Sequence, residues 1–323
     1  MLMKRKIASG LGLALFTIIL ITVFVQRQLI RDYYVVHTTQ LTAEAGQLEA
    51  KLALTKPAKF IYAASRPQVQ TAADFNNSCK SVSHEHSIVL GCYTAQQIYI
   101  FNVEDSRLDG VKEVTAAHEL LHAVYERMSN AEKMELDKQL LSTAESIDEQ
   151  RFKDTISEYK RTEPDQIANE LHSILGTEIA VLPTSLENHY KKYFNNRAQI
   201  VAYAKQYEGS FTSLENQIKD YDKELESLRS EKESLESSLT AQQQTIEDER
   251  SELDSLLENG DRQGYNNLVP VYNARIQQYN TTVNQLKQVV TTFNEIVQKR
   301  NVLAATQNDL VKRLDSSSYD PIE

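Results

Sequence analysis

Two histidines one helical turn apart form the spacing in this chain that most directly predicts chemistry. His118 and His122 lie in the stretch TAAHELLHAVYERM. Residues i and i+4 share one face of a helix, so both imidazoles can reach a single Zn²⁺ ion at about 2.0 to 2.1 Å. Glu119 is rotated about 100° from His118, where its carboxylate can act on water instead of binding the metal. The sequence therefore predicts a zinc site with Glu119 as the general base.

A catalytic zinc ion usually takes three protein ligands and leaves its fourth position to water. The candidates for the third ligand are downstream of the HELLH stretch: Glu170, His172, Glu178 and His189. Glu170 and His172 lie about 200° apart around a helix, so they cannot both face one metal ion. Spacing alone leaves the third ligand open.

Two segments resemble the metal-binding parts of zincin metallopeptidases. The run QIYIF followed by HELLH is similar to their edge strand and active-site helix, and NELHSILGTE resembles the segment of thermolysin-like gluzincins that supplies the third ligand from the Glu after Asn. This resemblance implies Glu170 as the third ligand, with His172 as the alternative. Ile174 stands where the gluzincin pattern has an Asp that orients a histidine, and Ser173 or Glu178 are the candidates to replace it.

A zinc peptidase also needs a hydrogen-bond donor for the oxyanion that forms during hydrolysis. His189, Tyr190 and Tyr193, in ENHYKKYF, are the candidates, and aromatic packing of an amphipathic helix is the alternative. Residues 60 to 195 also resemble a group of membrane-anchored bacterial proteins with no assigned activity. We expect a zinc-dependent peptidase that hydrolyses peptide or protein substrates; the alternative is a non-catalytic coiled-coil scaffold with a structural or vestigial metal site.

The N-terminal region has the pattern of a membrane anchor. Residues 7–25 are uncharged and mostly apolar; as a helix rising about 1.5 Å per residue they nearly match a hydrocarbon core of about 30 Å. The run is longer than the apolar part of a cleaved signal peptide. Lys4, Arg5 and Lys6 precede it, which favours a cytoplasmic N-terminus. We expect a single-pass signal anchor in the cell membrane, with the remaining chain outside the cytoplasm.

The two cysteines suit an oxidising compartment, where disulfides persist. A bridge between Cys79 and Cys92 would close a short loop and stabilise the fold by about 3 kcal/mol. We expect this disulfide; two unpaired buried thiols are the alternative.

Composition and periodicity predict the elements that position the site. Only nine Gly and six Pro occur in 323 residues, which favours helix, and the net charge of −10 argues against a nucleic-acid-binding protein. Short β-rich runs at 60–62, 87–90 and 97–101 predict a small sheet. Heptads on both sides of a loop at 259–264 predict two antiparallel helices, an acidic one and then a basic one, that pair with each other.

The expected fold class is an α+β zincin-like domain, built of a small sheet plus helices, with an N-terminal transmembrane helix and a C-terminal antiparallel helical coiled-coil hairpin. The chain as a whole is expected to be predominantly α, and the hairpin could also mediate self-association. The predicted organisation is a cytoplasmic tip and transmembrane anchor at 1–25, a helical stalk at 26–56, the zincin-like domain at 57–208, the hairpin at 209–315 and a tail at 316–323.

Overall fold

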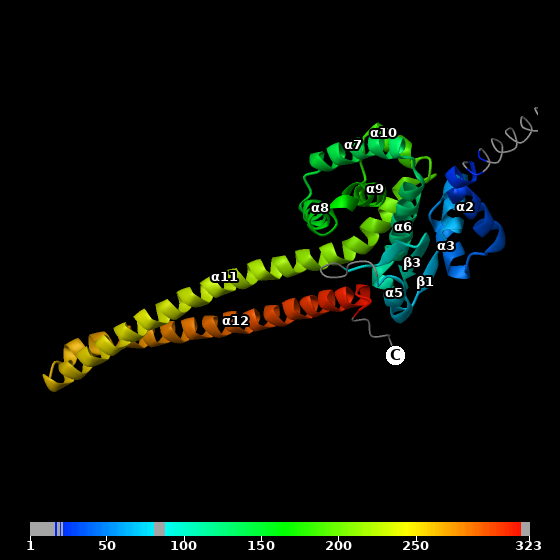
Figure 1. The fold of residues 1–323 in the computed structure, drawn as a ribbon. Helices are drawn as coiled ribbons and strands as arrows, with labels where there is room; N and C mark the ends of the chain where they lie inside the picture. Colours follow the sequence, from blue (N-terminus) through cyan, green and yellow to red (C-terminus); the bar gives the residue numbers. More distant parts are fainter. Residues whose placement is uncertain (1–16, 18–19, 21, 81–87, 318–323) are drawn as a thin grey trace, which may run out of the picture. The chain divides into compact units, whose positions relative to one another are not determined.

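The computed structural model describes residues 17, 20, 22–80 and 88–317. It is 79% helical and has one small sheet of three strands. The chain divides into two compact units (Figure 1). The first unit comprises residues 1–210 with 310–323, and the second comprises residues 211–309. All the predicted metal ligands belong to the first unit.

Near its N-terminal end, the described part of the first unit contains three helices, α2 (Arg27–Thr38), α3 (Ala43–Lys51) and α4 (Lys56–Ala64). The hydroxyls of Thr42 and Thr55 accept hydrogen bonds from the first turns of α3 and α4, as N-caps do. α2 packs on α4, and its buried Asp32 binds the Arg127 guanidinium through two hydrogen bonds of 2.8 and 2.9 Å. The segment expected to be a separate stalk is therefore packed onto the first unit.

The sheet has the strand order β1-β3-β2. β1 (Gln68–Gln70) runs parallel to β3 (Gln97–Phe101), and β2 (Gly91–Thr94) runs antiparallel to it. The run QIYIF is thus the central strand, whereas the resemblance implied an edge strand. The two edge strands beside it are β1 and β2.

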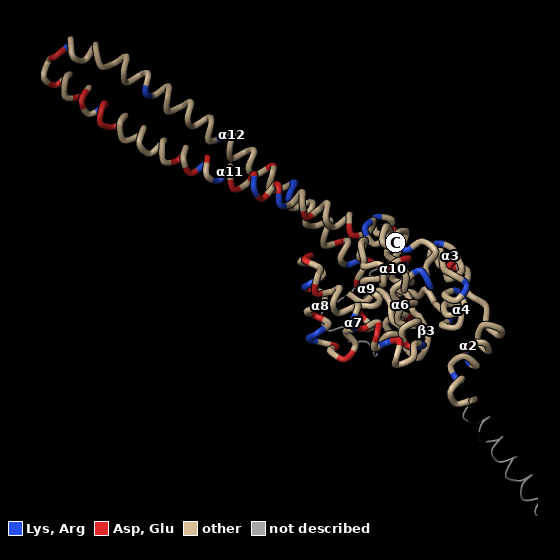
Figure 2. The backbone as a smooth tube through the Cα atoms, turned by 90° about the horizontal axis from the view of Figure 1, so that it is seen from above, with Lys and Arg blue, Asp and Glu red and all other residues tan. Residues whose placement is uncertain are grey.

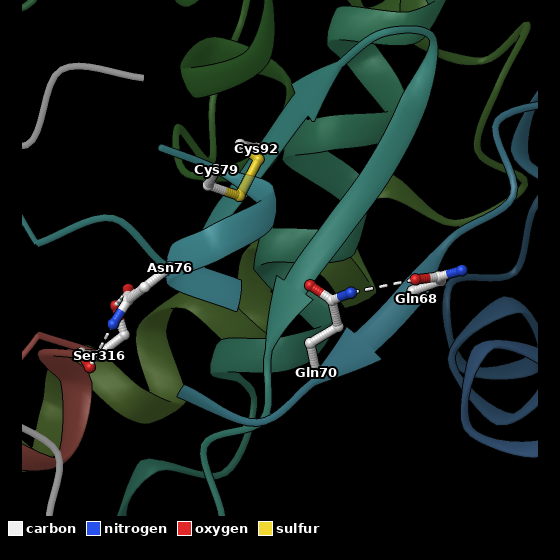
Figure 3. The surroundings of a disulfide bond; sticks show 6 residues. All are labelled: Gln68, Gln70, Asn76, Cys79, Cys92 and Ser316. Atoms are coloured by element: carbon white, nitrogen blue, oxygen red, sulfur yellow. Dashed lines mark hydrogen bonds between the residues drawn. A yellow bond between two sulfur atoms is a disulfide. The ribbon is translucent and has the colours of Figure 1, made fainter. Parts of the chain in front are cut away.

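A disulfide between Cys79 and Cys92 joins the end of α5 (Ala72–Ser78) to β2 (Figure 3). The same helix holds the C-terminal part of the first unit, because the Asn76 amide donates a hydrogen bond of 2.8 Å to the Ser316 carbonyl. The cysteine pair expected from the sequence is therefore bridged, and the bridge attaches β2 to its neighbouring helix.

Five further helices of the first unit follow the sheet: α6 (Val111–Arg127), α7 (Asn130–Ser146), α8 (Gln150–Thr162), α9 (Ile167–Thr177) and α10 (Thr184–Tyr190). Short 3-10 helices, η1 (Ser106–Leu108) and η2 (Pro164–Gln166), precede α6 and α9. α6 packs against α9 and against β3 (Figure 1). Fully buried leucines from both helices form this contact, among them Leu120, Leu121, Leu171 and Leu175. The two helices that carry the predicted ligands thus share one core.

The second unit is built from residues 211–258 of α11 (Arg197–Glu258) and 262–309 of α12 (Arg262–Leu314). As the heptads predict, these two long helices pack together. Figure 2 shows acidic residues recurring along α11 and few along α12. Ion pairs cross between them, including Arg275 with Glu249 at 2.5 Å and Arg300 with Asp222 at 3.0 Å.

The expected α+β zincin-like class is wrong. The three strands are only three to five residues long, and helices form nearly all the rest of the unit. One predicted strand, 60–62, lies inside α4, because Thr55 caps that helix and Pro57 occupies its first turn, where proline favours a helix start. Another, 87–90, precedes β2 without forming a strand over its described residues.

The expected transmembrane anchor is also overturned. In the part of the chain that the structure describes, no helix combines the length and the apolar character needed to cross a bilayer. Most of the predicted span, residues 7–16, 18, 19 and 21, lies outside the described residues. The expected single-pass location in the cell membrane is corrected by the same finding.

Candidate metal centre

α6 brings the three residues of the HELLH stretch together. Potential ligand atoms of His118, Glu119 and His122 all lie within 4.8 Å of one another. The helix starts after Gly110, whose φ of +101° and close approach to the Tyr203 carbonyl exclude a side chain there. The buried core on one side of α6 fixes its rotation, so the two imidazoles are presented at the edge of that core.

Glu170 reaches both imidazoles from α9. Its Oε2 atom lies 3.7 Å from His118 Nε2, and its Oε1 atom lies 3.6 Å from His122 Nε2. Ligand atoms around a tetrahedral zinc ion with bonds of about 2.0 to 2.1 Å are separated by roughly 3.3 Å. Each imidazole thus has one Glu170 oxygen, a different one for each ring, at nearly the spacing between two ligands of a zinc ion. The donor set of two histidines and one glutamate is one used by catalytic zinc sites.

The charge state of Glu170 also suits a ligand. Burial opposes ionisation of this carboxyl group, but nearby His122 and His118 and a hydrogen bond from Tyr159 outweigh that effect. The pKa of Glu170 is lowered to about 2, so the group is a carboxylate at neutral pH.

Asn169 holds the ring of His122 from the same helix, α9. Its Oδ1 atom lies 3.0 Å from His122 Nδ1. An amide oxygen can only accept, so Nδ1 is the donor in this contact, which leaves Nε2, the nitrogen nearer Glu170, to bind a metal ion when the ring is neutral. The Asn169 amide in turn donates to Gln166 Oε1 at 3.4 Å. This contact fixes the tautomer that metal binding needs.

Glu119 is buried beside the ligands, with 5% of its surface exposed. Burial raises the pKa of Glu119 to about 7. The charge of His122 lowers this pKa, and the charge of Glu170 raises it further. Gly91, at the start of β2, lies so close that a Cβ atom there would be 2.7 Å from Glu119 Oε1. The absence of a side chain at Gly91 therefore leaves room for the Glu119 carboxylate.

The ligands and Glu119 line a cavity of about 420 Å³. β2 and the residues before it form one wall, and α6, α8, α9 and the start of α11 form the others. Tyr159 of α8 lies in this lining and hydrogen-bonds to Glu170, which sequence reasoning missed. No local pattern marked Tyr159, because its role depends on how α8 packs on α9.

His172, the alternative third ligand, faces away from this cavity. It is fully buried, and its Nε2 atom lies 2.9 Å from His189 Nε2. Burial lowers the pKa of His172 well below its usual value, and the same effect lowers the pKa of His189 to about 4. Tyr190 donates a hydrogen bond of 2.8 Å to the His172 carbonyl. The geometry therefore separates Glu170, which faces the two HELLH histidines, from His172, which packs in the core.

The three residues expected as oxyanion donors are not brought to the cavity. His189 and Tyr193 line a different cavity beside α7, and Tyr190 is buried under α9. Ser173, one candidate to orient a histidine, donates a hydrogen bond of 3.1 Å to the backbone carbonyl of His118, and not to its imidazole ring. Asn169 takes that orienting position instead.

Comparison with known proteins identifies no relatives: no protein-family model, curated protein or solved structure matches this chain.

Proposed function

We propose that this chain is a zinc-dependent peptidase with His118, His122 and Glu170 as the metal ligands and Glu119 as the general base. The convergence of two imidazole nitrogens and one carboxylate from separate helices carries this proposal. Holding a carboxylate between two histidines inside a cavity is costly unless a ligand or proton compensates the charges. A zinc ion supplies that compensation and matches the donor set.

The residues around the ligands have distinct tasks in such a reaction. When bound, zinc supplies Lewis-acid chemistry that polarises a carbonyl group and makes water easier to deprotonate. Glu119 accepts the proton of the attacking water and passes it to the leaving amine nitrogen, a role favoured by a pKa near 7. Asn169 keeps His122 in its binding tautomer, and Tyr159 steadies Glu170.

The edge strand β2 supports a peptide as the substrate. β2 pairs with β3 on one side, and Gly91, Cys92 and Tyr93 line the cavity. An extended peptide can add to the edge of a sheet through main-chain hydrogen bonds. Such pairing would lay the peptide backbone along the cavity that contains Glu119.

The test uses the purified full-length chain loaded with zinc. Bound zinc is counted by elemental analysis, and cleavage of a mixed peptide library is measured with and without a chelator. We expect one zinc ion per chain, chelator-sensitive cleavage, and a loss of about 10² to 10⁴ in rate for Glu119→Gln with zinc retained. Glu145→Gln, at an exposed position on α7, is the matched control and should cleave normally.

Two results would overturn the proposal. A folded chain that binds no stoichiometric zinc lacks the metal centre. A chain that binds zinc but cleaves no peptide would favour the alternative of a non-catalytic scaffold with a structural metal site.

A further inference from the structure

The lining of the metal cavity is strongly acidic. Among the described residues that line it are four glutamates, Glu119, Glu163, Glu170 and Glu178, and no lysine or arginine. A divalent metal ion would balance the charges of Glu119 and Glu170. The carboxylates of Glu163 and Glu178 would then remain to interact with a bound substrate.

The two remaining carboxylates lie toward opposite ends of the cavity. Ser173 of α9 contacts the His118 carbonyl, and Asn169 contacts the His122 ring, so α6 and α9 run antiparallel. Glu178, at the C-cap of α9, therefore lies beyond His118. Glu163 precedes α9 and lies toward the other end, beyond His122. A substrate bound across the metal ligands would therefore pass near both carboxylates.

Glu178 is the better placed of the two to select a substrate. It is partly buried, and its carboxylate makes no hydrogen bond to any described residue. Two basic groups act on Glu178: His118, which is a metal ligand in the proposed site, and Arg151, whose guanidinium pairs with Glu208 at 2.9 Å and hydrogen-bonds to Tyr207. A carboxylate withdrawn from water without a hydrogen-bonded partner gains free energy when it meets a cation.

We infer that the cavity selects substrates with a positive charge next to the scissile bond, and that Glu178 is the residue that recognises this charge. The inference rests on the proposed peptidase function and names its substrate class. A lysine or arginine side chain and a free α-ammonium group share the required chemistry. Glu178 is thus a specificity-determining residue and takes no part in bond cleavage.

The experiment compares peptides that differ only in charge at positions flanking the cleaved bond. Arginine is replaced by citrulline, which keeps the shape and removes the charge, and each peptide is made with a free and with an acetylated N-terminus. For the zinc-loaded chain we expect kcat/KM about tenfold higher for the charged member of a pair. In Glu178→Gln this ratio should fall to about one or two, whereas Glu145→Gln should keep it.

A second readout does not depend on turnover. Calorimetric titration of Glu119→Gln with the same peptides should show tighter binding of the charged member by a similar factor. The additional substitution Glu178→Gln should abolish the difference. Weaker binding of the acetylated member identifies the α-ammonium group as the recognised cation, and weaker binding of the citrulline member identifies the side chain.

The outcomes separate this inference from the proposed function. If peptides are cleaved but neither citrulline replacement nor N-terminal acetylation lowers kcat/KM, the charge selection is refuted and the peptidase stands. If nothing is cleaved, the proposed function fails. A preference that survives Glu178→Gln would refute the assignment to this residue.

Discussion

Replacing Asn169 by alanine tests how the structure holds His122 ready for a metal ion. The substitution removes the acceptor that lies 3.0 Å from His122 Nδ1. Only 11% of the His122 side chain is exposed, so water cannot easily replace that acceptor. Loss of a partner that orients a metal-binding histidine typically weakens metal affinity by about 10- to 100-fold, which is about 1.4 to 2.7 kcal/mol. We expect a loss in the upper part of this range.

The assay is a zinc titration in competition with a chromophoric chelator of known affinity. Asn169→Asp retains an acceptor oxygen and should bind zinc nearly as tightly as the parent chain. Gln166→Ala removes only the 3.4 Å contact to Asn169 and should cost less than about threefold. If Asn169→Ala stays folded by circular dichroism and binds zinc within about twofold of the parent, the orienting role of Asn169 is refuted.

Three further predictions concern the walls and helix ends of the first unit. Gly91→Ala should slow peptide cleavage and cost about 1 to 3 kcal/mol in a urea titration, because the new methyl group collides with Glu119; normal activity would show that the contact is unimportant. Removing the disulfide, by Cys79→Ala with its partner also replaced, should lower the free energy of unfolding by about 3 kcal/mol, and an unchanged urea midpoint would contradict this. Ser129→Ala should cost about 1 kcal/mol at pH 7. Hydrogen bonds to Ser129 lower the pKa of Glu132, so this cost should shrink as the pH falls below 4.5, and a cost independent of pH would count against the capping box.

Local periodicity was enough to predict the centre of the site. His118 and His122 are one helical turn apart, and nothing more than a helix is needed to align them. Glu170 lies 48 positions further on, and its role came from a resemblance, because spacing left His172 equally open. Tertiary packing decides between them by rotating α9 so that Glu170 meets the two imidazoles.

Contacts between distant segments explain what the sequence did not predict. The β-rich character of residues 60–62 suggested a strand, yet the cap at Thr55 and the following proline make this segment helical. We predicted α2 as part of a stalk because its own sequence gives no sign that Asp32 binds Arg127, a residue 95 positions further along the chain. The resemblance to zincins likewise concerned two short segments and did not extend to the fold.

X-ray absorption at the zinc edge, on the full-length chain loaded with one equivalent of zinc, tests the metal centre most directly. The proposed site predicts two imidazole nitrogens and one carboxylate oxygen at about 2.0 to 2.2 Å. The Glu170→Gln spectrum should lose the carboxylate contribution. Failure to retain zinc, or a spectrum with fewer than two imidazoles, would contradict the assignment of His118, His122 and Glu170 as ligands.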